Sequence, residues 1–201
     1  SPIEWKQLKD GSVRLTQKVE PLTGIQKEMD IMLDAASTAV RVVHRLRNTN
    51  LWDTELAPWA LSVMAPGGAE IIPLPPKTPH PQGLAPNQQM IIWRYDGKKG
   101  PTKIGLAHKL GWVGYLNGGV LFIKALPYIE GRRYPDNGCN FETFTNQDFM
   151  EVESLGPVTR IAPGKSVEHV ERWWLVKDVN ADLSENGIEA NVRGQVEALL
   201  K

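Results

Sequence analysis

Hydrophobic and polar residues alternate with a period of two along much of the chain. Residues 24–33 carry apolar side chains on one side and polar ones on the other, with Ile25, Met29, Ile31 and Leu33 opposed to Gln26, Glu28 and Asp30. Residues 38–49 alternate in the same way. Because successive side chains of a strand point to opposite faces, this pattern predicts half-buried antiparallel strands.

Short turn sequences separate further strand candidates. Strands are also predicted over 12–19, 56–64, 89–95, 111–116, 119–126, 139–145, 148–153 and 167–177, with NTN, PGG, YDGKKG, NGG and PDNG between them. Many short strands separated by turns are typical of a sandwich or barrel. No internal repeat and no domain boundary is visible. The sequence therefore predicts one all-β domain over 1–201.

Two segments depart from the period of two. Residues 66–87 hold seven of the 15 prolines, and we expect a stiff extended connector there rather than a proline-rich recognition motif. Near the end of the chain, Ile188, Val192 and Val196 recur four residues apart and are followed by Leu199 and Leu200. This spacing predicts a short C-terminal helix, for which Ser184 is a candidate cap.

Composition excludes several classes of function. Lys plus Arg and Asp plus Glu both number 23, so the net charge is zero, which argues against a nucleic-acid or membrane-surface partner. A single cysteine, Cys139, excludes a disulfide framework and a cysteine-rich zinc site. No apolar run of about 18 residues is present, so no membrane span is predicted. The first residues, SPIEWKQL, lack the features of a signal peptide, and the compartment, cytoplasmic or periplasmic, stays open.

Three glutamates are the candidate catalytic residues. Alternation after the PDNG turn places Glu142 and Asn140 on one face of a strand, and MEVES places Glu151 and Glu153 on one face of the next. Two neighbouring strands would then present three carboxylates, which raise one another's pKa. Glycoside hydrolysis uses such a pair, about 5–5.5 Å apart for retention or 6.5–9.5 Å for inversion. The alternative is an ordinary solvated sheet face.

Aromatic and polar residues supply a candidate sugar-binding set. Tryptophan and tyrosine rings stack on the C–H faces of sugars, although each one alone is more often a core residue. The predicted substrate-binding residues are Trp59, Trp112, Tyr115, Arg132, Asn140, Asn146 and His169. His169 shares its strand face with Glu171, a spacing that favours a cross-face pair or a plain surface pair over a metal site. No cofactor is predicted; glutamate and asparagine oxygens suit Ca²⁺, but no spacing demands it.

The stretch NFETFTN, followed by SLGPVTRIAPGKSVEHVERWWLV, resembles the end of the galactose mutarotase-like superfamily. There a strand with a catalytic glutamate is followed by a Pro-Gly turn and a last strand, which here are Glu142, Pro163-Gly164 and residues 167–176. More narrowly, APWALSVMAPGG, GWVGYLN and GCNFETFTN are similar to an uncharacterised bacterial family assigned to that superfamily. The resemblance covers roughly residues 38–177.

The resemblance implies an antiparallel β-supersandwich with a sugar site on a concave face and Glu142 as general base. It also implies a histidine, serving as general acid, in the strand that corresponds to LAPWALSVM, and this stretch has none. We therefore expect a glycoside hydrolase-like protein acting at an anomeric centre through Glu142 with Glu151 or Glu153. The alternatives are a non-catalytic carbohydrate-binding module, an aldose epimerase-like protein with a degenerate site, and a scaffold without a site.

The chain is shorter than a full supersandwich, so we expect some N-terminal strands to be missing. An incomplete sandwich leaves a strand edge and part of an apolar face uncovered, and such edges invite pairing. The sequence therefore predicts a homodimer or higher oligomer with a saccharide ligand.

Overall fold

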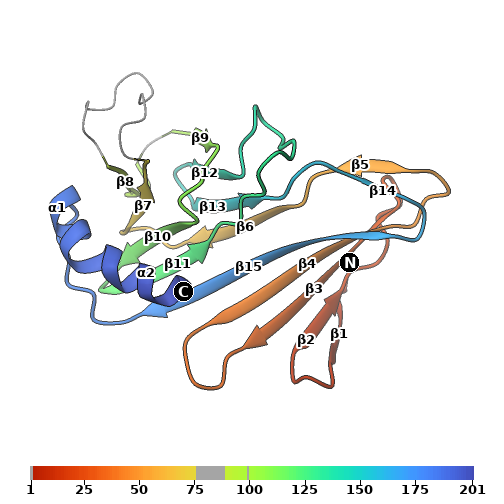
Figure 1. Ribbon diagram of the computed structural model, residues 1–201, viewed down its shortest axis with the longest axis horizontal. Helices are drawn as coiled ribbons and strands as arrows, with labels where there is room; N and C mark the ends of the chain where they lie inside the picture. Colours follow the sequence, from red (N-terminus) through yellow and green to blue (C-terminus); the bar gives the residue numbers. More distant parts are fainter. Residues whose placement is uncertain (1, 76–88, 99) are drawn as a thin grey trace.

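The computed structural model describes residues 2–75, 89–98 and 100–201, and nearly all of its regular structure is antiparallel β-sheet (Figure 1). The larger sheet has nine strands, which in order of pairing are β1 (Glu4–Gln7), β2 (Val13–Thr16), β3 (Ile25–Leu33), β4 (Val40–Asn48), β15 (Ser166–Val176), β11 (Val120–Ala125), β10 (Trp112–Asn117), β7 (Ala69–Pro73) and β8 (Met90–Arg94). The smaller sheet has four, β6 (Trp59–Met64), β13 (Met150–Leu155), β12 (Phe141–Thr145) and β9 (Thr102–Leu106). A two-stranded ribbon joins β5 (Thr54–Leu56) to β14 (Thr159–Ile161).

The strands predicted from alternation are confirmed, except that the strand predicted over 56–64 has different bounds. Of the segment predicted as a single strand over 56–64, residues 59–64 form β6, whereas Leu56 is the last residue of β5, which begins at Thr54. Pro58 lies between them and has no N–H to donate to a ladder. Its carbonyl instead accepts a hydrogen bond of 2.8 Å from the Gly156 amide.

Four strands were missed by the sequence patterns: β1, β7, β9 and β14. Strand β7 lies inside the proline-rich segment 66–87, where a connector was expected, and all five of its residues are buried. A strand covered on both faces has no reason to alternate, so its pattern does not reveal it. Residues 76–87 of that segment lie outside the described residues.

The middle of the larger sheet is covered on both faces. One face, with Trp112, Leu121 and Ile123, packs against the C-terminal helical segment, while Val113 and Ile72 on the other face pack against the smaller sheet. The helical segment runs over 16 residues as α1 (Glu185–Ile188), a π-helical turn η1 (Glu189–Arg193) and α2 (Gly194–Leu200).

The predicted C-terminal helix is confirmed. Ile188, Val192 and Val196 are fully buried against the sheet. The Ser184 hydroxyl caps the helix by accepting a hydrogen bond of 3.1 Å from the Gly187 amide. No helix among the described residues is long and apolar enough to span a membrane.

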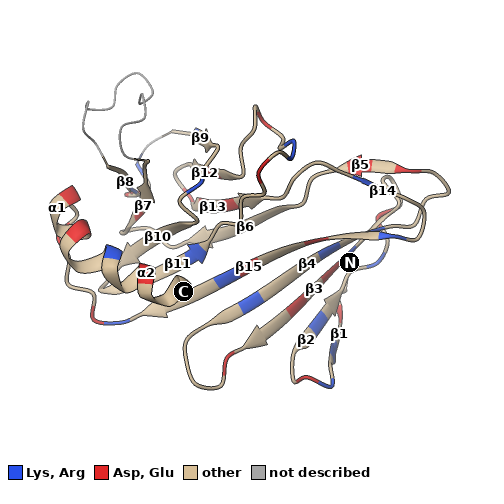
Figure 2. Cartoon of the chain, in the orientation of Figure 1, with Lys and Arg blue, Asp and Glu red and all other residues tan. Residues whose placement is uncertain are grey.

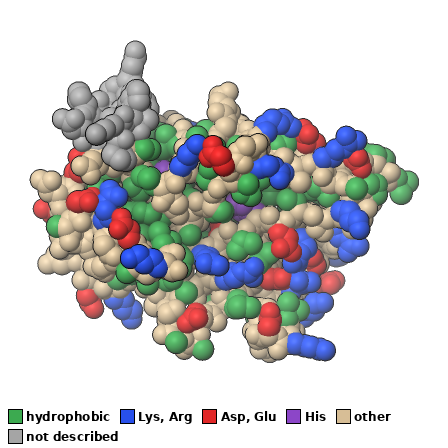
Figure 3. All heavy atoms as spheres, in the orientation of Figure 1, with side chains coloured by type: hydrophobic (Ala, Val, Ile, Leu, Met, Phe, Trp, Pro, Cys, Tyr) green, Lys and Arg blue, Asp and Glu red, His purple; other side chains and the backbone are tan. Residues whose placement is uncertain are grey.

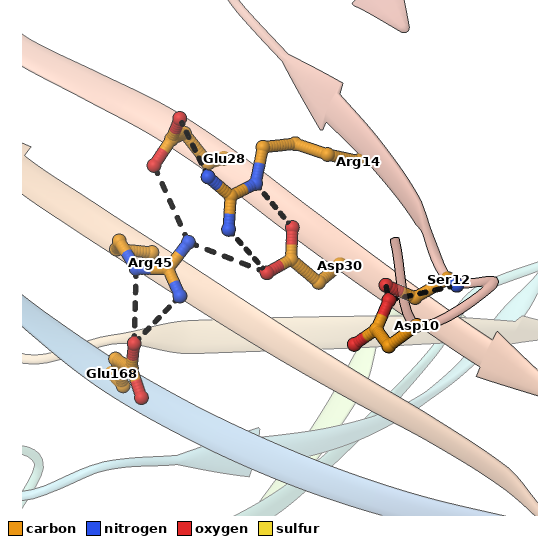
Figure 4. A network of polar contacts seen from close by, with 7 residues as sticks. All are labelled: Asp10, Ser12, Arg14, Glu28, Asp30, Arg45 and Glu168. Carbon is orange, nitrogen blue, oxygen red and sulfur yellow. Dashed lines mark hydrogen bonds and ion pairs between the residues drawn. The ribbon is translucent and has the colours of Figure 1, made fainter. Parts of the chain in front are cut away.

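Strands β1–β4 form a wing whose two faces differ. On the outer face, acidic and basic residues alternate across neighbouring strands (Figure 2). There Arg14 binds Asp30 through two hydrogen bonds of 2.6 Å, and Arg45 bridges Asp30, Glu28 and Glu168 (Figure 4). Charges of both signs are also interspersed on the face seen in Figure 3.

The inner face of the wing carries Leu15, Met29 and His44 as directly opposite residues of β2, β3 and β4. Strand β6, an edge of the smaller sheet, borders this face. Between them runs a groove of about 550 Å³ whose lining includes Leu15, Met29, His44, Leu46, Pro58 and Trp59. The second sheet is thus too small to cover the whole wing.

Candidate functional site

Two predicted catalytic glutamates meet on the smaller sheet. Glu142 on β12 and Glu153 on β13 are directly opposite partners in the antiparallel register. Their side chains lie on the face turned away from the larger sheet, because Phe141 and Val152, which alternate with them, pack into the core between the sheets. Only 3% of Glu142 and 1% of Glu153 is exposed. The structure thus brings these two carboxylates together, as their spacing predicted.

Lys103 on β9 contacts both carboxylates. Its Nζ lies 2.7 Å from Glu142 Oε2 and 3.6 Å from Glu153 Oε2, while 40% of its side chain is exposed. A single ammonium therefore closes the solvent side of the pair and compensates part of its charge.

Gly105 makes room for this arrangement. It is the residue of β9 opposite Glu142, and a Cβ built on it would lie 2.7 Å from Cys139 Sγ and 3.3 Å from Glu142 Oε1. A side chain at this position would collide with the thiol and crowd the carboxylate. The absence of a side chain thus lets the carboxylate lie against β9.

Trp59 on β6 forms the outer wall of the pair. Its Nε1 donates a hydrogen bond of 2.7 Å to Glu153 Oε2, and its ring centroid lies 4.6 Å from Lys103 Nζ. The residue is nevertheless 52% exposed. We call Trp59, Lys103, Glu142 and Glu153 the carboxylate site.

Burial sets the electrostatics of the carboxylate site. It raises the pKa of Glu142, against the opposing effect of Lys103, and Asp136 and Glu153 raise that pKa further. Burial also raises the pKa of Glu153, while the Trp59 N–H and Lys103 oppose the rise. The site can therefore hold a proton at a higher pH than an exposed carboxylate does.

The PDNG turn brings a further acidic group to the site. Asp136, Asn137 and Gly138 have φ of 46°, 60° and 97°, values that aspartate, asparagine and glycine tolerate best. The Gly138 and Cys139 amides both donate to the Pro135 carbonyl, at 2.9 and 3.0 Å. Strand β12 begins only at Phe141, so Asn140 and Cys139 precede the strand that was predicted to contain them.

The other predicted residues lie elsewhere. Glu151 shares the face of the pair but stands opposite Phe144, two residues further along the ladder. Asn140 is buried and binds the His108 backbone, accepting from its N–H at 2.6 Å and donating to its carbonyl at 2.9 Å. Asn146 Oδ1 accepts from the amides of residues 148 and 149 in the β12–β13 turn.

Two predicted aromatic platforms are core residues. Trp112 is buried in the cluster beneath the C-terminal helix. Tyr115 is buried, and its hydroxyl donates to the Ala65 carbonyl at 2.5 Å. Arg132 is exposed, with its guanidinium 3.5 Å from the Thr159 hydroxyl. None of these three side chains has a described contact with the carboxylate site.

A second polar cluster lies between the two sheets, and the sequence predicted only its His169 and Glu171 as neighbours on one face. Lys124 Nζ is fully buried, 2.6 Å from Glu171 Oε1, and it donates to the carbonyls of Ala60 and Val152. His44 Nε2 lies 3.0 Å from Glu171 Oε2. We call Lys124, Glu171, His44, Ser154 and His169 the inter-sheet cluster. A further signal was available in the sequence, a lysine within the apolar strand VLFIKA.

Hydrogen bonds complete the inter-sheet cluster. The Ser154 hydroxyl donates to Glu171 Oε1 at 2.5 Å, so His169 Nε2, 2.7 Å away, donates to Ser154 Oγ. Burial would raise the pKa of Glu171, but its hydrogen bonds and Lys124 outweigh burial and lower the pKa to about 2. Burial lowers the pKa of His169 to about 4. His169 and Glu171 thus share a face, as predicted, and both bind Ser154.

No group of three or more histidine, cysteine, aspartate or glutamate side chains suited to a metal ion comes together in the part of the chain that the structure describes. His44 connects the inter-sheet cluster to the groove, since it lines the groove and binds Glu171.

Comparison with known proteins gives similarity in fold alone. No family model matches the sequence. No curated protein matches it either. Several solved structures resemble the chain, and the identities range from 9% to 14% among seven of them. A TPR-domain containing protein from Parabacteroides distasonis has a TM-score of 0.60 at 14% identity, with 90% of this chain and 35% of that chain covered.

A putative aldose 1-epimerase from Escherichia coli K12 has a TM-score of 0.58 at 13% identity, with 88% of this chain and 69% of that chain covered. A galactose mutarotase-like protein from Lactobacillus casei has a TM-score of 0.55 at 12% identity, with coverage of 87% and 73%. This chain thus spans about a third of the first structure and about two thirds or more of the other two. Together with its two antiparallel sheets, these matches show that the chain has the galactose mutarotase-like fold.

Proposed function

We propose that this protein binds a saccharide against Trp59 and acts at its anomeric centre through Glu142 and Glu153. The observation that carries the proposal is the carboxylate site itself. Two directly opposite glutamates with raised pKa values lie beside a half-exposed tryptophan. The fold, shared with proteins described as epimerase-like and mutarotase-like, agrees with a carbohydrate ligand.

The contacts favour different roles for the two carboxylates. Glu142 makes the shorter contact with Lys103, at 2.7 Å, which favours its ionised form and a role as base or nucleophile. Glu153 is the more completely buried of the two and is 3.6 Å from Lys103, which favours a protonated form that can act as general acid.

The cross-strand geometry favours a retaining reaction. Directly opposite residues of antiparallel strands have Cβ atoms about 4.5–5.5 Å apart. The two carboxyl groups are also close together, because Lys103 Nζ lies 2.7 Å from Glu142 Oε2 and 3.6 Å from Glu153 Oε2. Retaining glycosidases hold their carboxyl groups about 5–5.5 Å apart, whereas inverting ones need room for a water molecule. Lys103 has a flexible stem and must move from the pair when a substrate enters. The exposed ring of Trp59 would then support the C–H face of the sugar.

A second function, saccharide binding without catalysis, is favoured by one observation. The carboxylates are almost completely buried, and Lys103 occupies the side from which a sugar would approach. If Lys103 stays on the pair, the sugar would contact Trp59 and the ammonium but not the carboxylates.

Hydrolysis of a panel of nitrophenyl glycosides tests the proposal. We would compare the wild type with Glu142→Gln, Glu153→Gln and Glu151→Gln, with Glu55→Gln, an exposed glutamate paired with Arg133, as the control. Turnover that is lost in the first two variants and kept in the control would support catalysis by the pair.

Tryptophan fluorescence separates the two functions. Sugar-dependent quenching without turnover, abolished by Trp59→Ala but kept by Trp52→Ala, would support binding alone. Trp52 is also exposed but has no described contact with the carboxylate site. If no sugar of the panel is turned over and none quenches the fluorescence, both functions are refuted.

A further inference from the structure

Strand β1 is an edge strand of the larger sheet. Strand β1 pairs with β2, and no other strand among the described residues pairs with it (Figure 1). All four of its residues are exposed, and Trp5 is 72% exposed. An unprotected edge next to an exposed aromatic side chain is a typical site for pairing with another strand.

The hairpin geometry shows which backbone groups point outward from this edge. The Leu8 amide donates to the Ser12 carbonyl at 2.8 Å, which makes these two residues a hydrogen-bonded pair. In an antiparallel ladder such pairs recur at every second residue. Glu4 and Lys6 therefore direct their backbone groups toward β2. Ile3, Trp5 and Gln7 direct theirs toward the open edge.

The side chains of β1 divide between two faces. Trp5 is opposite Leu15, which is opposite Met29, so it stands on the apolar inner face of the wing. Glu4 and Lys6 stand on the outer, charged face, where Lys6 is opposite Arg14. The ion-pair network of Figure 4 ends at Arg14 on this side. Neither Glu4 nor Lys6 forms an ion pair with any described residue.

We propose that two copies of this chain pair through β1, antiparallel and about a twofold axis at Trp5. In this register Trp5 is opposite the partner's Trp5, and Ile3 is opposite the partner's Gln7. These residues have the free backbone groups, so the ladder continues across the interface. Glu4 is then opposite the partner's Lys6, and Lys6 is opposite the partner's Glu4.

Charge selects this register over its neighbours. A shift by two residues in one direction puts Glu4 opposite the partner's Glu4, and a shift in the other puts Lys6 opposite the partner's Lys6. Like charges directly opposite each other destabilise a sheet, whereas opposite charges stabilise it. The Trp5-centred register forms two ion pairs, and its interface is self-complementary, as a twofold dimer requires.

The dimer provides partners for two groups that lack them among the described residues of the single chain, the charges of Glu4 and Lys6 and the exposed ring of Trp5. It pairs Glu4 and Lys6, which extends the ion-pair network of the wing across both copies. It also places two tryptophans side by side on the apolar inner face, next to the groove that Ile3, Leu15 and Met29 help to line. None of the paired residues of this dimer belongs to the carboxylate site.

Charge reversal tests the proposal, with analytical ultracentrifugation over a concentration series as the readout. We expect the wild type to form dimers. Glu4→Lys and Lys6→Glu should each weaken dimerisation by at least about tenfold, since either change places like charges opposite each other twice. Lys18→Glu, at an exposed position outside β1, is the control and should dimerise as the wild type does.

Two combinations distinguish this register from simple misfolding. The double variant Glu4→Lys/Lys6→Glu restores both ion pairs and should dimerise again. An equimolar mixture of the two single variants should form a heterodimer, because all four facing charges are then complementary. A wild type that is monomeric at all concentrations would overturn the proposal. So would single variants that dimerise like the wild type, or a mixture that stays monomeric.

Discussion

Replacement of Glu70 by glutamine should change how the stability of the protein depends on pH. Glu70 lies on β7, opposite Tyr115 of β10, and is fully buried. Neither of its carboxyl oxygens makes a hydrogen bond of good geometry with a described residue, although the Thr143 hydroxyl is close enough to lower the pKa. Burial dominates and raises the pKa of Glu70 from 4.5 to about 8.

The sign of the effect follows from the two pKa values. The folded protein keeps the Glu70 proton up to about pH 8, whereas the unfolded chain releases it near pH 4.5. The favourable contribution of this proton is therefore complete below pH 4.5 and is lost as the pH rises toward 8. Each pH unit in that window costs about 1.4 kcal/mol, so stability falls by about 3 kcal/mol between pH 5 and pH 7.5.

Glutamine is a neutral near-isostere and has no proton to lose. The free energy of unfolding of Glu70→Gln, minus that of the wild type, should therefore be about 3 kcal/mol larger at pH 7.5 than at pH 5. Urea unfolding of both proteins at several pH values measures the difference. Glu130→Gln, at an exposed position, should show none. A difference that does not vary with pH would refute the assignment of a protonated Glu70.

Three further substitutions test the packing. Lys124→Met should destabilise the fold by about 3–5 kcal/mol because it leaves Glu171 buried without its cation, and thermal unfolding should show a smaller loss when Glu171→Gln is added. Gly105→Ala should cost about 1–3 kcal/mol through the collision with Cys139 Sγ, and Cys139→Ala should recover part of that cost in urea unfolding; an unchanged midpoint would contradict the close approach. Ser184→Ala should cost about 1 kcal/mol by removing the helix cap, and equal stability of the two proteins would argue against the cap.

Periodicity predicted features that depend on one strand and its neighbour. The alternation of β12 and β13 was enough to place Glu142 and Glu153 on one face, because a period of two fixes the face of every residue in a strand. The recurrence of Ile188, Val192 and Val196 was enough to predict the buried face of the C-terminal helix. Both features depend on residues that are close together in the sequence.

Contacts between separate segments were not predicted. Lys103 reaches the carboxylates from β9, a short strand in a segment without clear alternation. The inter-sheet cluster depends on how one sheet lies over the other, which no strand pattern encodes. Trp112 and Trp59 look alike in sequence, yet one is buried under the helix and the other is half exposed, because coverage of a face is decided by distant elements. Whether residues 1–201 form one domain stays a prediction.

Lys124 gives the sandwich a defined alignment. Apolar contacts are non-directional, so they define the alignment of two sheets less sharply than buried hydrogen bonds do. The Lys124 ammonium instead meets carbonyls from two different strands of the smaller sheet, Ala60 on β6 and Val152 on β13, while it holds Glu171 on its own sheet. A slip of one strand would leave a charge in a dry interior without partners. The hydrogen bonds of the inter-sheet cluster are thus satisfied in only one relative position of the two sheets. That position also determines where Trp59, on β6, lies relative to the wing.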